Sequence, residues 1–389
     1  MKSTELLNSG ENPACTPKKR NSSIELLKLV AMLCIVISHV AQTLGTPRPE
    51  LLYPADVFFD TIHTARTVPQ FIILLFRHLG AFGNLLFFTC TAWFLYGSGR
   101  TRRSRIFQIA ADVWMLSVLS LAVFFAAGFR LPWKKVFMLF FPMTFGINWY
   151  TTCYVCFLAA VPFLNNLIGR LERRELLKAC LVFCAVYFGI CNVAASFYYY
   201  TELMLFIALY FVVSYIKLYA PQAAENVRLN LFVFAVSTGL LFLLIFLTNA
   251  LGFKSSFFER NALHWARNNN PLMILAAFSL FNLCRSKAFY SKAVNYASSL
   301  TLFIYLIHEG LIVRECVRPR IWLELHSRFG YSHIAVLTLA FALCLFAAST
   351  AAAAVYKETL SRLTKKAAQT AEQLARNIFR WIDGLLARR

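Results

Sequence analysis

The stretch IELLKLVAMLCIVISHV, from Ile24 to Val40, decides the fold because it is almost wholly apolar yet carries a lysine and a histidine. With the residues up to 44 it is long enough to cross a bilayer as a helix. Lys28 and His39 lie eleven residues apart, so they leave a helix on nearly the same face, roughly 16 Å apart along its axis. A charge and an imidazole inside a bilayer need a cavity to face. The stretch therefore predicts a membrane-spanning helix that carries a functional site.

Composition indicates an all-α integral membrane protein. The 389 residues are 59% hydrophobic and only 15% charged, and their mean hydropathy is +0.59. The first apolar stretch lacks a small-residue cleavage site, so we expect it to be retained as a span. The net charge of +21 belongs to the loops of such a chain and sets its orientation. Nucleic-acid binding is disfavoured because no basic and aromatic groove pattern is present.

About ten transmembrane helices are predicted, with both termini cytoplasmic. Residues 128–148 are broken by Pro132 and Pro142, so we expect a re-entrant or interfacial segment on the outer side. The predicted inner segments hold 25 Lys and Arg and the outer ones 12, which favours this orientation. The predicted spans are 24–44, 79–97, 106–127, 149–168, 178–196, 202–219, 229–250, 271–284, 294–313 and 334–356.

The chain divides into a cytoplasmic N-terminal tail (1–20), a membrane domain (21–357) and a C-terminal tail (358–389). In the last of these, apolar residues recur at helical spacing, and the segment from Lys357 holds eight Lys or Arg against three acids. This pattern is typical of a basic amphipathic cytoplasmic helix on an anionic membrane surface. A docked or partly disordered tail fits the pattern equally well.

The first candidates are Lys28 and Asp112 near the inner side of the predicted spans and His39 in the outer half of the first span. Lys28 lies near the inner face and Asp112 at a depth of roughly 10 Å, so we expect them to pair or to line one inner vestibule. The alternatives are a lysine that extends to the headgroups and an Asp112 bonded to a hydroxyl of a neighbouring helix. His39 is able to take and give a proton near neutral pH, although a helix-packing histidine is equally compatible.

Further candidates lie in the outer halves of two other spans. The stretch LFIYLIHEGLIVRE, from Leu302 to Glu315, brings His308 and Glu309 close to Arg314, with Tyr305 one turn before His308. It predicts either a site for an outward-facing polar substrate or an interfacial capping cluster. Trp149 and Tyr150 stand where another span begins, and an aromatic belt would place the same residues there.

No metal site and no disulfide framework are predicted. Cys153 and Cys156 form a CxxC motif without further ligands nearby, and nine of the eleven cysteines fall in apolar spans.

Several segments in this order resemble the acyltransferase 3 family of integral membrane acyltransferases, in its stand-alone bacterial surface-polysaccharide O-acetyltransferase branch. In the first helix of this family an arginine is followed, after ten intervening residues, by a histidine. Lys28 and His39 have the same spacing, with lysine in place of the arginine. Other similar segments are FFTCTAWFL (Phe87 to Leu95), WYTTCY with the later PFLN (Trp149 to Asn165), NNPL (Asn269 to Leu272) and YLIHE followed by Arg314. The likeness covers 20–357.

This resemblance implies transfer of an acyl group, usually acetyl, from cytoplasmic acyl-CoA to a hydroxyl of an extracytoplasmic glycan. It implies catalytic roles for His39 and His308, and acyl-CoA binding by residues near the inner face: Lys28, Arg102, Arg103 and Asp112. It implies that the acceptor, a cell-surface polysaccharide or glycolipid, is held by Trp149, Tyr150, Tyr305, Glu309 and Arg314. Acyl-CoA would be a donor substrate and no cofactor would be bound permanently. We expect a multi-pass protein of the bacterial cytoplasmic membrane.

A transporter or flippase for lipid-linked sugars is the alternative function, because ten spans with intramembrane charges fit that class as well. The lack of internal repeats and the spacing in the first span disfavour it.

Overall fold

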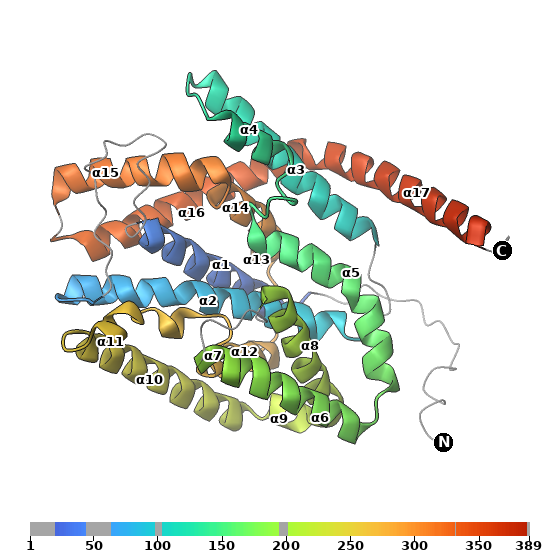
Figure 1. Ribbon diagram of the computed structural model, residues 1–389, viewed down its shortest axis with the longest axis horizontal. Helices are drawn as coiled ribbons and strands as arrows, with labels where there is room; N and C mark the ends of the chain where they lie inside the picture. Colours follow the sequence, from blue (N-terminus) through green and yellow to red (C-terminus); the bar gives the residue numbers. More distant parts are fainter. Residues whose placement is uncertain (1–19, 44–63, 98–102, 194–200, 331, 387–389) are drawn as a thin grey trace.

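The chain folds as a bundle of long helices, and its computed structural model describes residues 20–43, 64–97, 103–193, 201–330 and 332–386. No strand occurs in these ranges. Most helices run along the long axis of the molecule (Figure 1). The prediction of an all-α membrane protein is therefore confirmed.

Within the described residues, eight helices are long and apolar enough to cross a membrane. A ninth span is formed if the bent pair 292–308 and 313–329 counts as one. The remaining predicted span coincides with α12, a helix of 16 residues that packs against α10 and α2. The eight are α1 (Ser22–Thr43), α2 (Val68–Leu95), α3 (Arg103–Ala126), α5 (Trp149–Arg170), α6 with η2 and α7 (Arg173–Val193), α8 (Glu202–Tyr219), α10 (Val227–Gly252) and α16 (Ile334–Thr359).

The other elements are short connecting segments, the 16-residue helix α12 and the C-terminal helix α17. They are α4 (Trp133–Phe140), α9 (Pro221–Glu225), α11 (Ser256–Arg260), the 3-10 turn η3 (His264–Ala266), α12 (Pro271–Ser286), α13 (Lys292–Ser298), α14 (Thr301–His308), the π-helical turn η4 (Val313–Val317), α15 (Arg318–Phe329) and α17 (Ser361–Leu386). The broken outer segment predicted for 128–148 contains only α4 and turns, and α17 agrees with the helical spacing of the C-terminal tail.

Helix α1 lies inside the bundle, where α2, α12, α13, α14 and α16 all contact it. Its closest approach to α2 depends on glycine, because a Cβ at Gly83 would lie 2.5 Å from the carbonyl oxygen of Ala31. At Gly80 a Cβ would lie 2.6 Å from the hydroxyl of Ser38, which donates a hydrogen bond to the carbonyl of Arg77. Small residues of this kind let membrane helices approach closely. This contact fixes the face of α1 that turns toward α14.

Two predicted boundaries are wrong. Helix α2 begins at Val68 rather than at 79, because Thr67 and Gln70 form a capping box at its start and Arg77 and His78 continue the helix. The imidazole of His78 is buried, and its Nδ1 lies 2.7 Å from the carbonyl oxygen of Leu74, so a polar residue is accommodated within the helix.

The predicted ninth span is also not continuous. Helix α14 ends at His308, and the chain bends by 60° before α15, which lies between the predicted spans 294–313 and 334–356. Gly310 stands at the bend, where a Cβ would lie only 3.0 Å from the carbonyl oxygen of Leu306. The bend turns the charged residues that follow it back toward α1, and the site depends on this turn.

Candidate active site

The site is built around His39, which α1 presents toward the end of α14. Val36, about one turn before it, and Val40, the residue after it, are fully buried and hold this part of α1 in the core. The Nδ1 atom of His39 lies 3.1 Å from Nε2 of His308 and 3.0 Å from Oε2 of Glu309. Two residues that follow it by 269 and 270 positions in the sequence thus meet the histidine of the first span.

The hydrogen bonds assign the tautomers of both histidines. The Nδ1 atom of His308 lies 2.7 Å from the carbonyl oxygen of Ile304, so it must donate there and leave Nε2 as an acceptor. Nδ1 of His39, which faces that acceptor and the carboxylate of Glu309, therefore carries the proton. It follows that Nε2 of His39 has an available lone pair, as a general base requires.

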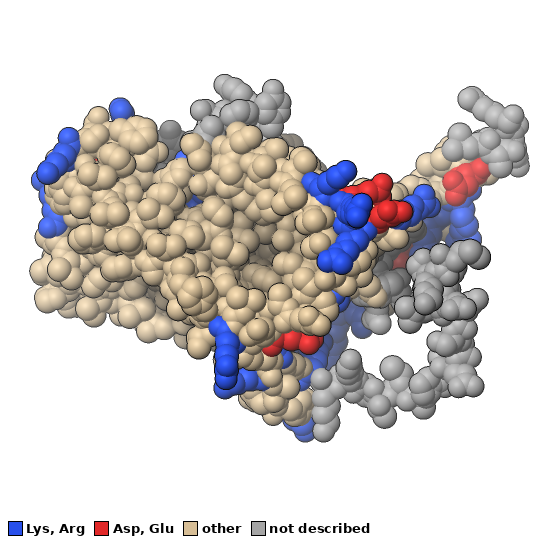
Figure 2. Space-filling model, turned by 90° about the horizontal axis from the view of Figure 1, so that it is seen from below, with Lys and Arg blue, Asp and Glu red and all other residues tan. Residues whose placement is uncertain are grey.

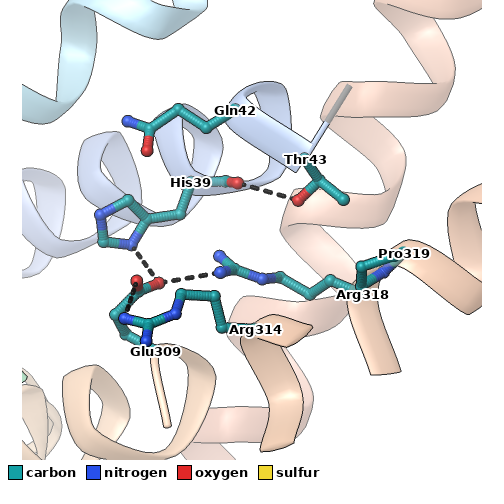
Figure 3. Close-up of a pocket in the computed structure, with 7 residues that line it drawn as sticks. All are labelled: His39, Gln42, Thr43, Glu309, Arg314, Arg318 and Pro319. Carbon is teal, nitrogen blue, oxygen red and sulfur yellow. Dashed lines mark hydrogen bonds and ion pairs between the residues drawn. The ribbon is translucent and has the colours of Figure 1, made fainter. Parts of the chain in front are cut away.

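Glu309 links this histidine to two arginines. Its carboxylate lies 3.0 Å from Nη2 of Arg318 and 3.4 Å from Nη1 of Arg314, and Arg314 also donates to the carbonyl of Ile147 at 3.1 Å. Figure 3 shows the carboxylate between the imidazole on one side and the two guanidinium groups on the other. Buried ion pairs of this kind fix side-chain geometry, so the imidazole is held in one orientation.

A pocket opens beside this group of charges. Its walls come from the C-terminal end of α1 and from the bent segment after α14, and Gln42 lies on the opposite side of the imidazole from Glu309 (Figure 3). The pocket offers an imidazole, an amide, a hydroxyl and two guanidinium groups, which suits a polar or anionic ligand better than an apolar one. It is lined by His39, Gln42, Thr43, Glu309, Arg314, Arg318 and Pro319.

The structure brings together the outer candidates that the sequence indicated. His39, His308, Glu309 and Arg314 form one cluster, and the ring of Tyr305 lies 5.9 Å from that of His308. The aromatic candidates at the start of α5 continue this cluster. The Tyr150 ring lies 6.0 Å from that of Tyr305, and the Trp149 ring lies 5.6 Å from that of Tyr150.

The inner candidates do not come together. Lys28 forms an ion pair with Glu25 at 3.1 Å, and the predicted pairing with Asp112 is absent. Asp112 instead accepts hydrogen bonds from the hydroxyls of Tyr356 and Thr364, at 2.7 and 2.6 Å. Three neutral donors satisfy this carboxylate, since Gln108 also donates to it, and this explains why it needs no lysine. Arg102 and the side chain of Arg103 lie outside the described residues.

Sequence reasoning missed Arg318, Gln42 and Thr43 in the pocket. Arg318 fell within a predicted outer loop, although a spacing of four from Arg314 would have placed both on one helical face. Gln42 and Thr43 follow His39 by three and four residues, so helical spacing could also have indicated them.

A second group of cations, at the other end of the bundle, was missed as well. The guanidinium of Arg285 lies 4.6 Å from the ring centre of Trp93, and the ammonium of Lys217 lies 5.6 Å from it. Lys217 also donates to the carbonyls of Trp93 and Tyr96, at 2.7 and 2.8 Å. No carboxylate of the described chain forms an ion pair with either cation, so this group, which we call the inner cation cluster, suits an external anion.

We call the group formed by His39, His308, Glu309 and Arg314 the outer cluster. Its residues fit metal binding less well than proton transfer. His39, His308 and Glu309 each offer a ligand atom within 4.8 Å of the others. The carboxylate, however, is already paired with the guanidinium groups of Arg314 and Arg318, and a metal cation would be repelled by both.

The family model described as an acyltransferase domain, that of acyltransferase 3, matches residues 21–357. No curated protein and no solved structure matches the chain.

Proposed function

The chain belongs to the acyltransferase 3 family and is a membrane acyltransferase, and from this premise we propose that it moves an acetyl group from cytoplasmic acyl-CoA to a hydroxyl of an extracytoplasmic surface glycan. The protein would act as a multi-pass enzyme of the bacterial cytoplasmic membrane, with both termini inside. The observation that carries the proposal is the pairing of His39 with Glu309 at the edge of a polar pocket.

His39 is proposed as the general base. Its Nε2 takes the proton of the sugar hydroxyl while the hydroxyl oxygen attacks the thioester carbonyl. The carbon–oxygen bond forms, the carbon–sulfur bond breaks, and the proton leaves with the thiol of CoA. Glu309, at 3.0 Å from Nδ1, stabilises the imidazolium that forms during the transfer. His308 accepts from the same Nδ1 and thereby helps to hold the ring in the productive tautomer.

The acceptor is proposed to lie in the pocket. Arg314 and Arg318 border it, and both offer donors to sugar hydroxyls or to the oxyanion of the tetrahedral intermediate. Tyr150, Tyr305 and Trp149 extend the site with aromatic faces on which a sugar ring can pack.

The donor is proposed to bind at the inner end. Acyl-CoA is a polyanion with an aromatic base. The inner cation cluster offers the indole of Trp93 and two cations, and no carboxylate of the described chain forms an ion pair with either cation. This proposal replaces Asp112 as a donor contact, because that carboxylate is occupied by its own hydrogen bonds. Lys28 remains a candidate through its place on α1.

The experiment compares surface glycans from cells that lack the chain with those from complemented cells. We expect the O-acetyl signals in NMR spectra of the glycan to vanish in the deletion strain and to return with the wild type. They should not return with His39→Ala. His264→Ala is the matched control, because this histidine lies in the turn η3, away from the pocket residues.

Two outcomes of this experiment would speak against acyl transfer. Unchanged O-acetylation in the deletion strain would contradict the proposal. Loss of the whole glycan from the surface, with normal acetylation of the remainder, would indicate a transporter. Incubation of the purified protein with labelled acetyl-CoA supplies a direct reading, in which release or transfer of acetyl is expected for the wild type and not for His39→Ala.

A further inference from the structure

Helix α17 lies outside the residues that the family model matches, and its two faces differ sharply. At 100° per residue, one half of the helical circumference is apolar and the other half polar. The apolar half carries Leu363, Ala367, Ala368, Ala371, Leu374, Ile378, Phe379, Trp381 and Ile382. The polar half carries the five cations Arg362, Lys365, Lys366, Arg376 and Arg380 and only two acids, Glu372 and Asp383.

The first half of α17 is anchored to the bundle. Thr364 and Ala368 are each only 2% exposed, and the hydroxyl of Thr364 lies 2.6 Å from Asp112 of α3. Gln108 of α3 donates to the same hydroxyl at 3.0 Å. We call this contact between α3 and α17 the Asp112 latch.

The second half of α17 has no partner within the described chain. Leu374, Phe379 and Trp381 are 61%, 60% and 66% exposed, although they continue the apolar face that is buried at Thr364 and Ala368. A contiguous apolar face with two exposed aromatic rings does not remain in water without a cost in free energy.

The second half of α17 projects beyond the bundle. Figure 1 shows α17 running alongside α3 in the opposite direction and continuing past the end of the bundle at which α3 begins. Only five residues, roughly 8 Å of helix, separate Gln108 from the start of α3 at Arg103, whereas α17 continues for 22 residues, roughly 33 Å, past Thr364. Most of α17 therefore extends past the inner end of α3.

We propose that residues 373–386 of α17 bind the anionic surface of the cytoplasmic leaflet, with the apolar face among the acyl chains and the cations at the headgroups. The choice of leaflet rests on the orientation given with the proposed function. A lipid surface is favoured over a second copy of the chain because Arg376 and Arg380 would repel their equivalents, whereas acidic headgroups attract them. Phe379 and Trp381 are residue types that settle at a membrane interface.

Hydrogen–deuterium exchange of the full-length protein in lipid nanodiscs tests this proposal. We expect the backbone amides of 373–386 to exchange about tenfold more slowly in nanodiscs that contain phosphatidylglycerol than in those of phosphatidylcholine alone. Charge reversal by Arg376→Glu with Arg380→Glu should remove most of this difference, while exchange in α1 and α2 stays unchanged and reports an intact bundle.

Arg328→Glu is the matched control. Arg328 is an exposed helical arginine that pairs with a glutamate four residues earlier at 2.6 Å, as Arg376 does with Glu372. It should leave the lipid dependence of 373–386 unaltered. Equal exchange in the two lipids would overturn the proposal, and so would protection in phosphatidylcholine that rises with protein concentration, which indicates a second copy. Because the measurement needs no turnover and nanodiscs expose both membrane faces, its result is independent of the acyl-transfer activity.

Discussion

Glu309 is the residue that joins His39 to the two arginines. One of its oxygens lies 3.0 Å from both Nδ1 of His39 and Nη2 of Arg318, so it orients the imidazole and balances the guanidinium at the same time. In hydrolytic triads a carboxylate likewise accepts a hydrogen bond from Nδ1 of a histidine. Loss of the carboxylate charge there leaves the imidazole in place but in the wrong tautomer.

We therefore predict that Glu309→Gln lowers kcat of acyl transfer by about a hundred- to ten-thousandfold and also lowers the unfolding temperature, because the buried guanidinium of Arg318 loses the carboxylate that balances it. Steady-state kinetics on purified protein, with thermal unfolding measured alongside, provide the check. Glu324→Gln is the control, because Glu324 is 61% exposed and pairs only with the neighbouring Arg328. Activity of Glu309→Gln within threefold of the wild type would exclude the general-base role of the pair.

At the scale of the element, the contact between α1 and α2 determines where His39 points. Gly83 allows the two backbones to meet, since an added Cβ would lie 2.5 Å from the carbonyl oxygen of Ala31 and 2.7 Å from Cγ1 of Ile35. Both contacts are too short for a real methyl group, so α1 would have to shift, and His39 lies only one turn beyond Ile35.

We predict that Gly83→Ala destabilises the protein by about 1–3 kcal/mol and also lowers activity, because the displaced helix carries the base. Thermal unfolding in detergent and the acyl-transfer assay measure the two effects. Gly239→Ala, in the middle of α10, serves as the control, since no atom lies within 4 Å of its would-be Cβ. Equal unfolding temperatures for the two variants would show that the contact has no such role.

The Asp112 latch is the second element-scale contact. Removing the carboxylate would leave the buried hydroxyls of Tyr356 and Thr364 without their acceptor, which costs roughly 2–4 kcal/mol in total.

Asp112→Ala is therefore predicted to lower the unfolding temperature and to release the first half of α17 for faster hydrogen exchange. Asp383→Ala, on the exposed polar face of the same helix, should change neither quantity. Retention of wild-type exchange at residues 361–372 in Asp112→Ala would mean that apolar packing alone holds α17.

At the scale of the whole molecule, the site for chemistry and the inner cation cluster occupy opposite ends of the bundle. Figure 2 shows charged side chains gathered toward the ends of the long axis, with a broad uncharged middle on this face. That distribution fits a bilayer around the middle, so a donor from one side and an acceptor from the other would have to meet inside the protein.

Arg285→Gln is accordingly predicted to raise KM for acetyl-CoA about tenfold while leaving kcat within a factor of three. The substitution removes a positive charge from the proposed donor site and leaves the residues that line the pocket unchanged. Initial rates over a range of acetyl-CoA concentrations provide the measurement. Arg228→Gln, an exposed cation near the same end, should leave KM unaltered. A fall in kcat at constant KM for Arg285→Gln would place the donor elsewhere.

Hydropathy and local spacing determined much of this protein before any contact was known. The all-α membrane class, the position of most spans and the amphipathic C-terminal helix follow from the order of apolar residues, because each depends on neighbours within a few turns. The motifs around His39 and His308 likewise indicated the outer cluster, although they lie 269 positions apart.

Only the tertiary structure decided which charges meet. Lys28 and Asp112 were predicted at a similar depth along the membrane axis, yet they face different neighbours, because the rotation of each helix follows from packing such as that at Gly83. Arg318 enters the pocket through the 60° bend after α14, which hydropathy could not reveal, since a broken and a straight helix have the same composition. Long-range packing placed the imidazole of His39 beside the carboxylate of Glu309, whereas the local sequence determined the helices that carry them.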